Sequence, residues 1–309
     1  MSQVINTLLP IFGLILIGFV CRRAGCLGEN AASELNRFVV WLCLPALLFQ
    51  VTGTATVEQI WHPNFILAFT LATLLVFGVV VLWKWRSGRS LADASIDGLS
   101  AGYANTGYVG IPLCLFVFGD NGLEPALVSS LIVVCVLFSI AIVVIEVGLQ
   151  SGQSAGQAVR KVLLALLKNP LVVSPMAGGL WAWGGLEIPQ TANTFLGILG
   201  DATVPCALVS LGAFLAHKQS GSANGAWSLV WIKLMVHPLL TWVLVFHVFQ
   251  APLMWAQAAV LLSALPTGTG PYMLAEFYGR EASVASRTIL ISTIGSIGTL
   301  SACLIWMAG

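Results

Sequence analysis

Charge is what this chain has least of. Asp, Glu, Lys and Arg make up only 8% of its 309 residues, whereas hydrophobic residues make up 58% and the mean hydropathy is +0.94. No soluble domain is built from this composition, so the sequence predicts an all-α polytopic membrane protein whose surroundings are the lipid bilayer. The chain also lacks a basic patch, which argues against a nucleic-acid partner.

Short motifs of metal and enzyme sites are lacking as well. The seven cysteines form no CxxC or Cys/His cluster, and we expect them to be small buried side chains. HExxH, GxSG and GxGD motifs are absent, so we expect no metal, no cofactor and no catalytic residue, with an intramembrane enzyme as a remote alternative. The first residues lack the charged n-region and AxA site of a removable signal, and we expect them to form a membrane span.

What the chain does contain is apolar runs of the length of a membrane helix, repeated ten times. The predicted spans are 3–21, 35–53, 64–84, 96–118, 125–149, 163–184, 191–216, 227–249, 255–277 and 284–307. An even number of spans places both termini on the same side of the membrane.

The basic residues predict which side that is. All thirteen Lys and Arg residues except Lys233 lie in or beside the odd-numbered loops. The even-numbered loops contain only acidic charges, at Glu58, Asp120, Glu124 and Glu187. Because cytoplasmic loops carry an excess of Lys and Arg, we expect a multi-pass protein of the inner (plasma) membrane with both termini outside the cytoplasm.

The chain also repeats itself. A polar cytoplasmic linker at 150–162 separates residues 1–149 from residues 163–309. A shift of 160 residues aligns several structural markers of the two parts: Pro10 with Pro170, Gly18 with Gly178, Gly25 with Gly185, Pro45 with Pro205, Gly110 with Gly270 and Gly119 with Gly279. Each part holds five spans, an odd number, so the sequence predicts two inverted five-helix repeats.

Spans 4 and 9 hold equivalent places in the two repeats, and small polar residues, glycine and proline interrupt both. Gly107 can end one half-helix and Pro112 can start the next, and Gly268 or Gly270 followed by Pro271 repeats this pattern. Restarted half-helices present free N–H groups near the midplane, which suit a carboxylate. The predicted substrate-binding residues are Asn105, Thr106, Gly107, Tyr108, Gly110, Pro112, Thr267, Gly268, Thr269, Gly270, Pro271 and Tyr272. Ordinary Gly/Pro kinks are the alternative.

Three segments carry a resemblance to a known family. They read Asn-Thr-Gly-Tyr-Val-Gly-Ile-Pro-Leu at 105–113, Leu-Pro-Ala-Leu-Leu-Phe at 44–49 and Pro-Thr-Gly-Thr-Gly-Pro-Tyr-Met-Leu-Ala-Glu at 266–276. Over its whole length the chain resembles the bacterial branch of the auxin efflux carrier family, nearest its malonate and malate transporter members. The plant carriers differ by a long central loop and an Asn-containing ninth-span motif, which makes auxin a poor substrate candidate.

The resemblance implies a secondary transporter of a small organic anion. Spans 4 and 9 would cross at their breaks, within a moving transport domain of spans 3–5 and 8–10. Spans 1, 2, 6 and 7 would form the scaffold, through which a homodimer could form. An elevator-like movement would expose the substrate alternately, and the scaffold would face it with Pro45, Phe49 and Gln50.

Four ionisable residues in or beside spans are candidates for charge coupling, because a charge inside the membrane is costly. Lys233 could neutralise a substrate carboxylate or pair with Asp201, and it could also snorkel to the surface. His237, one turn from Lys233, could carry a coupling proton or remain a neutral hydrogen-bonded side chain. Glu276 follows the ninth-span break and is more typical of an interface. H⁺ is the expected coupling ion; a Na⁺-coupled symporter of the bile-acid type is the alternative.

Overall fold

A computed structural model describes residues 2–54, 56, 61–149, 164, 167–168, 170–216 and 225–308. The expected linker at 150–162 lies outside these residues, and so does the side chain of Glu276. The described residues form helices and one isolated β-bridge, with no longer strand among them. The chain is therefore all-α, as its composition predicts.

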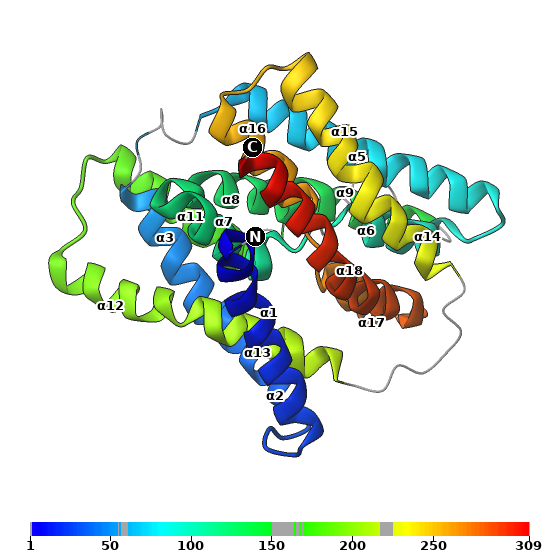
Figure 1. Cartoon of the computed structure of the whole chain (residues 1–309), viewed down its shortest axis with the longest axis horizontal. Coiled ribbons are helices and arrows are strands. Elements are labelled where there is room, and N and C mark those ends of the chain that lie inside the picture. The colour runs from blue at the N-terminus through cyan, green and yellow to red at the C-terminus, as the bar shows by residue number, and fades with distance from the viewer. Residues whose placement is uncertain are drawn as a thin grey trace. The chain divides into compact units, whose positions relative to one another are not determined.

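The helices follow one another along the chain and are labelled in Figure 1. They are α1 (Ser2–Arg23), α2 (Ala31–Phe38), η1 (Val39–Cys43), α3 (Leu44–Thr54), α5 (Pro63–Arg86), α6 (Leu91–Gly102), η2 (Thr106–Gly110), α7 (Ile111–Phe118), η3 (Gly119–Gly122), α8 (Leu123–Leu131), η4 (Ile132–Leu137), α9 (Phe138–Leu149), α11 (Pro170–Trp183), α12 (Gln190–Asp201), α13 (Thr203–Leu215), α14 (Ala226–Trp231), η5 (Ile232–Val236), α15 (His237–Trp242), η6 (Val243–Val248), α16 (Leu253–Ser263), α17 (Gly270–Phe277) and α18 (Ser283–Ala308).

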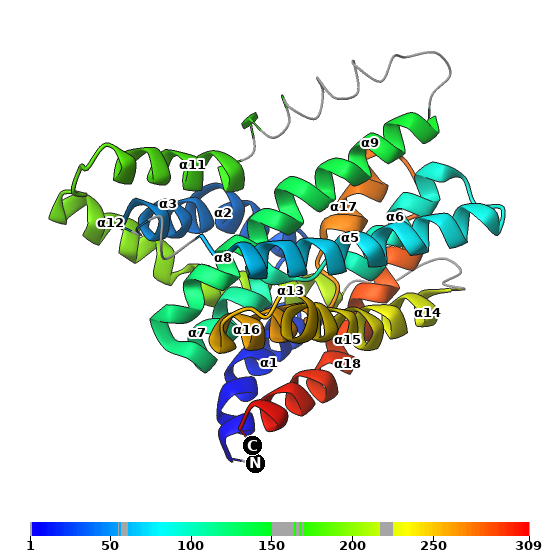
Figure 2. The same ribbon diagram turned by 90° about the horizontal axis from the view of Figure 1, so that it is seen from above.

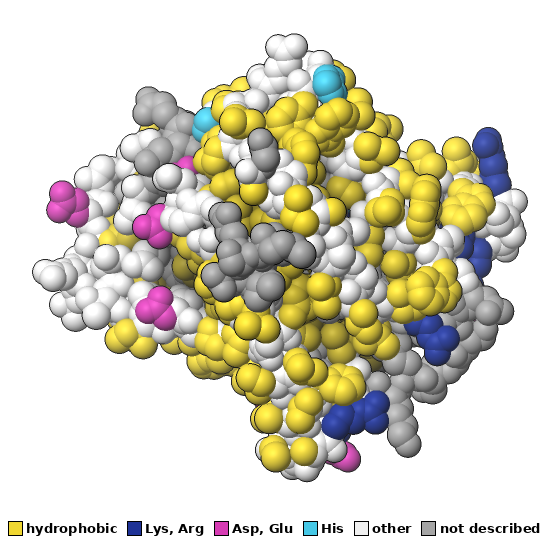
Figure 3. Space-filling view, viewed as in Figure 1, with side chains coloured by type: hydrophobic (Ala, Val, Ile, Leu, Met, Phe, Trp, Pro, Cys, Tyr) yellow, Lys and Arg dark blue, Asp and Glu magenta, His cyan; other side chains and the backbone are white. Residues whose placement is uncertain are grey.

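Six continuous helical stretches of the described chain are long and apolar enough to cross a membrane. They are Ala31–Thr54, Pro63–Arg86, Thr106–Leu149, Gln190–Leu215, Ala226–Val248 and Ser283–Ala308. Hydrophobic side chains, yellow in Figure 3, cover much of the face shown there. A surface of this kind suits lipid rather than water. The count of ten spans and the side of the termini stay predictions.

The chain divides into two compact units. Unit 1 comprises residues 1–61, 107–127 and 166–218, and unit 2 comprises residues 62–106, 128–165 and 219–309. Spans 1, 2, 6 and 7 thus contribute to unit 1, together with the part of the fourth span from Gly107 onward. Which unit moves, and whether either acts as a scaffold, stays a prediction.

Unit 1 is held together by close approaches at glycine. α1 packs against α13, and a Cβ on Gly18 would overlap the Val209 carbonyl. α11 packs against α3, beside which it lies in Figures 1 and 2, and a Cβ on Gly178 would overlap the Phe49 carbonyl. Under the predicted shift of 160 residues, Gly18 corresponds to Gly178 and Phe49 corresponds to Val209. Small residues let membrane helices approach backbone to backbone.

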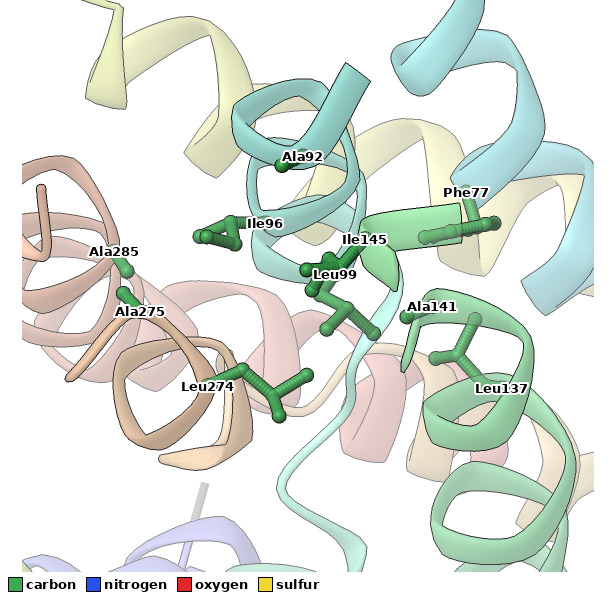
Figure 4. Close-up of a cluster of buried hydrophobic side chains, with 10 residues drawn as sticks. All are labelled: Phe77, Ala92, Ile96, Leu99, Leu137, Ala141, Ile145, Leu274, Ala275 and Ala285. Atoms are coloured by element: carbon green, nitrogen blue, oxygen red, sulfur yellow. The ribbon is translucent and has the colours of Figure 1, made fainter. Parts of the chain in front are cut away.

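Unit 2 has a core of small and branched side chains. It is drawn in Figure 4 and consists of Phe77, Ala92, Ile96, Leu99, Leu137, Ala141, Ile145, Leu274, Ala275 and Ala285. These residues come from α5, α6, η4, α9, α17 and α18. The alanines allow α17 and α18 to approach α6 closely.

Candidate functional site

Two interruptions of the helices meet within unit 2. α6 ends at Gly102 and the next helical residue is Thr106, while α16 ends at Ser263 and α17 begins at Gly270. Ala104 and Thr267 form an antiparallel bridge, in which the Asn105 N–H donates to the Pro266 carbonyl (2.9 Å) and the Gly268 N–H to the Tyr103 carbonyl (3.0 Å). We call residues 103–106 and 264–269 the crossover. Pairing with each other satisfies backbone groups that have no helical partner.

The first interruption begins earlier than the sequence indicated. Gly107 was expected to end a half-helix, but α6 ends at Gly102, and Gly107 lies inside η2. The physical reason is the bridge, since residues 103–105 must be extended to pair with residues 266–268. In the ninth span Gly270 is the first residue of α17, and Pro271 lies in its first turn, where a missing N–H costs nothing.

Side chains from neighbouring helices complete the crossover. The Thr267 N–H donates to the Ser292 hydroxyl (3.0 Å), and the Thr267 hydroxyl donates to the Ser100 carbonyl (2.7 Å). The Thr299 hydroxyl donates to the Ala264 carbonyl (3.4 Å). Thr267 is fully buried, so both of its polar groups are used in holding the crossover together.

Gly268 and Gly270 leave room for an aromatic ring. A Cβ on Gly268 would lie 2.8 Å from the Tyr103 ring, and a Cβ on Gly270 would lie 2.7 Å from it. The ring also packs edge-to-face on Phe138, with centroids 5.8 Å apart. Any larger residue at either glycine would push Tyr103 away, so the two glycines set the distance between the crossover segments.

The remaining predicted residues of unit 2 lie on or directly after the crossover. Asn105 and Thr106 are buried. Thr269 is half-buried, and its hydroxyl lies 3.9 Å from the Met273 sulfur. Tyr272 is half-buried against the core of Figure 4. Unit 2 therefore gathers amide and hydroxyl groups where α17 begins, and an N-terminal helix end favours a negative charge.

Unit 2 also buries two of the predicted ionisable residues. Lys233 is fully buried, and its ammonium donates to the Ser263 carbonyl at 2.5 Å, so it ends inside the unit rather than at its surface. His237 is fully buried, with its Nε2 3.3 Å from the Thr73 hydroxyl. The described residues contain no group of three or more His, Cys, Asp or Glu side chains that could hold a metal ion.

Sequence reasoning missed a buried acid on α6. Asp97 lies 3.5 Å from the Arg89 guanidinium and 4.0 Å from the Lys84 ammonium. The sequence did contain a signal, because Asp97 is an acid inside the predicted span 96–118, and basic residues stand in the loop before it. Ser292 and Thr299 were missed too, although they continue a line of hydroxyls at helical spacing on α18, formed by Thr288, Ser292, Ser296 and Thr299.

Unit 2 also contains an ion pair between Arg280 and Asp93, which lies outside the predicted membrane spans. Arg280 donates from Nε to one Asp93 oxygen (2.7 Å) and from a terminal nitrogen to the other (2.5 Å). These bonds hold the pKa of the Asp93 carboxyl below its ordinary value. Ser90 caps α6 by accepting the Asp93 N–H (3.1 Å). The pair joins the start of α6 to the connection between α17 and α18.

Unit 1 holds the other predicted site residues, which are Gly107, Tyr108, Gly110, Pro112, Pro45, Phe49, Gln50 and Asp201. The Tyr108 hydroxyl donates to the Asn36 side chain of α2. The Gln50 amide donates to the Asn193 side chain of α12 (2.7 Å). Asp201 is exposed at the end of α12. Their part in binding a substrate, and any pairing of Asp201 with Lys233, stay predictions.

Comparison with known proteins gives this geometry a context. A family described as "Membrane transport protein" matches residues 3–304. A protein of Rhizobium meliloti (strain 1021) named "Putative malonate transporter" is 29% identical over 308 residues, which cover 98% of this chain and 96% of that protein. "Uncharacterized transporter YfdV" of Escherichia coli (strain K12) is 25% identical over 307 residues, covering 96% and 95%.

A plant relative extends the same comparison. "Auxin efflux carrier component 5" of Arabidopsis thaliana is 22% identical over 340 residues, which cover 97% of this chain and 95% of that protein. The family match spans both interrupted helical segments and nearly the whole chain, so the chain is a multi-pass membrane transporter rather than an enzyme. It belongs to the membrane transport protein family that includes the auxin efflux carriers.

Proposed function

We propose that this transporter carries a small organic anion, a short carboxylate such as malonate or malate, with the anion bound at the crossover of unit 2. The observation that carries the proposal is the backbone bridge between Ala104 and Thr267. It joins two interrupted helices, and interrupted helices mark the substrate sites of many secondary transporters. The name of the Rhizobium meliloti relative favours malonate within this class.

The groups at the crossover suit a carboxylate. α17 begins there, so its first N–H groups and the positive end of its dipole are available to an anion. Asn105, Thr106 and Thr269 supply amide and hydroxyl donors next to it. Thr267 contributes by fixing the backbone, because its own polar groups are bonded to Ser100 and Ser292. A short dicarboxylate matches a site with several donors and a dipole.

Two inverted repeats would give the alternating access that transport requires, and the backbone supports them. Gly25 and Gly185 are equivalent under the shift of 160 residues and have φ of 77° and 64°. Gly119 and Gly279 are equivalent too, with φ of 63° and 59°. Only glycine adopts such values readily, so equivalent turns recur in both halves. The matched contacts of Gly18 and Gly178 add to this.

An elevator-like movement of unit 2 is the mechanism we propose for alternating access. The described chain divides into two compact units, and the crossover lies wholly within unit 2. A substrate bound there would travel with unit 2. Carriers built from repeats work by movement of one part of the molecule against the other, and here the part that moves would carry the site with it.

Uptake of radiolabelled malonate into proteoliposomes tests the proposal, with pH, Na⁺ and voltage gradients imposed one at a time. We expect saturable uptake that Asn105→Ala and Thr269→Val reduce at least tenfold, since each removes a donor from the crossover. Ser301→Ala is the matched control, because its hydroxyl bonds the Ile297 carbonyl of its own helix at 2.6 Å. Equal uptake by all four proteins would remove the crossover as the site.

The gradients separate the coupling modes. Uptake that follows a proton gradient supports an anion/H⁺ symporter and assigns the coupling to ionisable groups such as His237. Uptake driven by voltage alone supports a uniporter. Uptake that requires Na⁺ would replace both with the Na⁺-coupled symporter. Absence of malonate uptake under every gradient removes malonate, and a panel of other short carboxylates then tests the wider class.

A further inference from the structure

The buried ammonium of Lys233 donates a hydrogen bond to a carbonyl that lacks its helical N–H donor, because the helix ends there. Its bond is to the carbonyl of Ser263, the last residue of α16. In a continuing helix that carbonyl would accept the N–H of Thr267, four residues later. The Thr267 N–H donates to the Ser292 hydroxyl instead. Lys233 therefore replaces the missing helical donor at the C-terminal end of α16.

The electrostatics of that position favour a cation. The last carbonyls of a helix carry the negative end of its dipole, and carriers with interrupted helices bind Na⁺ at such ends. Among the described residues of unit 2, no carboxylate forms an ion pair with Lys233. Asp97, on the adjacent α6, is paired with Arg89. The helix end is thus the partner of the Lys233 charge.

Other charges near Lys233 do not change this assignment. On α15, His237 is bonded to the Thr73 hydroxyl. On α18, Arg287 is exposed. On α6, Asp93 is bonded to Arg280. None of these side chains takes the place of Lys233 at the Ser263 carbonyl.

We propose that Lys233 is a built-in cation: its ammonium fills the position at the end of α16 that a bound Na⁺ takes in ion-coupled carriers, so unit 2 needs no metal ion to complete the crossover. Lys233 is then a positioning residue, which acts on the substrate through the crossover backbone. The expectation that transport runs without Na⁺ rests on the proposed function. The position of Lys233 at the helix end is independent of that function.

Thermal unfolding of the purified full-length protein tests the occupancy, in NaCl and in choline chloride of equal ionic strength, without malonate. We expect the wild-type Tm to be the same in both salts. Lys233→Met should lower Tm by about 5 °C or more, because the helix end loses its charge partner, and Lys233→Arg should lower it less. Lys233→Ala leaves space for an ion, so its Tm should be higher in NaCl than in choline chloride.

Thr299→Val is the matched control, since it removes a neutral donor from the neighbouring Ala264 carbonyl. Its Tm should be equal in the two salts. A saturable rise of the wild-type Tm with NaCl would overturn the proposal, as would a Lys233→Met protein as stable as the wild type. A Lys233→Ala protein with equal Tm in both salts would overturn it too. If Lys233→Ala does not fold, the wild-type and Lys233→Met measurements decide. These results stand even if no uptake of malonate is found.

Discussion

Unit 1 and unit 2 are both built from apolar helices, but they differ in what they bury. Among the described residues the buried Asp, Lys and His side chains, which are Asp97, Lys233 and His237, all belong to unit 2. The buried polar residues of unit 1 are Thr52, Thr203 and Ser210. Unit 1 is instead joined by glycine contacts between backbones. Both units are closely packed, but only in unit 2 do buried charged side chains and hydrogen bonds to interrupted helices add to the packing.

The difference has a physical cause. In a membrane each unpaired backbone group costs several kcal/mol, so an interrupted helix must find polar partners. The crossover of unit 2 recruits Ser292, Thr299 and Lys233 for that purpose. The helices α1, α3, α11 and α13 of unit 1 need no such partners and can use small residues to approach closely. Some of the buried polar side chains of unit 2 therefore serve the backbone groups of its interrupted helices.

The sharpest test of unit 1 is Gly178→Ala. The new Cβ would lie 2.5 Å from the Phe49 carbonyl and would overlap the Thr52 hydroxyl, so α11 and α3 must separate. We expect a loss of at least about 2 kcal/mol in the free energy of unfolding. Gly179→Ala is the control, because nothing lies within 4 Å of its Cβ position, and a helical alanine there should not destabilise. Thermal unfolding in detergent measures both.

The proposed repeat predicts the same pair of outcomes in α1. Gly18→Ala should be as damaging as Gly178→Ala, and Gly13→Ala, with open space at its Cβ, should be tolerated. Equal stability of all four variants would contradict glycine packing as the basis of unit 1. A large loss for Gly178→Ala and none for Gly18→Ala would break the equivalence of the two contacts.

In unit 2 the corresponding test is Ser292→Ala. It leaves the buried Thr267 N–H without its acceptor, so we expect a loss of about 1–3 kcal/mol in the free energy of unfolding. Ser301→Ala on the same helix should change the free energy of unfolding by less than about 0.5 kcal/mol. The Ser301 hydroxyl donates to the Ile297 carbonyl of its own helix, so its removal leaves no buried N–H without an acceptor. Hydrogen exchange of the Thr267 N–H would directly report the loss of its bond to Ser292. Unchanged protection there would contradict the role of Ser292.

Much of the fold could be predicted from the sequence, because the composition and the length of the apolar runs indicate membrane helices. Sparse charge predicts membrane helices, and helices occupy the described residues. Glycine and proline act locally and predict breaks in two membrane spans, which stays a prediction. The helix limits could not be predicted in this way: α6 ends at Gly102 because the residues after it pair with a segment about 160 residues away, and a local pattern contains no such information.

The partners of the crossover were beyond the sequence for the same reason. Thr267 was predicted to bind substrate, and the structure bonds its hydroxyl to Ser100 and its N–H to Ser292. Lys233 was predicted by its charge, but its bond to Ser263 depends on how α16 packs against its neighbours. Residue type thus indicated some of the buried polar side chains, such as Lys233, His237 and Thr267, whereas only the packing shows which groups they bond.

The Asp93–Arg280 pair tests a weaker kind of polar contact in unit 2. The pKa of Asp93 lies below its ordinary value of 3.8, chiefly because Arg280 donates hydrogen bonds to the carboxylate. The ion pair therefore stabilises the folded protein above about pH 4. This stabilisation is lost as the pH falls through the lowered pKa of Asp93. Asp93→Asn should reduce stability by about 1 kcal/mol at pH 7. The Tm difference from wild type should shrink steadily as the pH is lowered below about 4. A difference that does not change with pH would exclude the carboxylate charge as its cause.

The smallest change in stability is expected for a solvent-exposed ion pair of unit 1. Arg37 and Glu34 lie 3.7 Å apart on α2, with side chains 71% and 67% exposed. Water and salt screen such a pair, and ordering two long side chains offsets the attraction, so Glu34→Gln should change the free energy of unfolding by less than about 0.5 kcal/mol. Thermal unfolding at low and high NaCl should give the same small difference from wild type. A loss as large as that of Asp93→Asn would mean that exposed charges matter as much to unit 1 as partly buried ones do to unit 2. The contrast between packing and polar bonding would then no longer separate the two units.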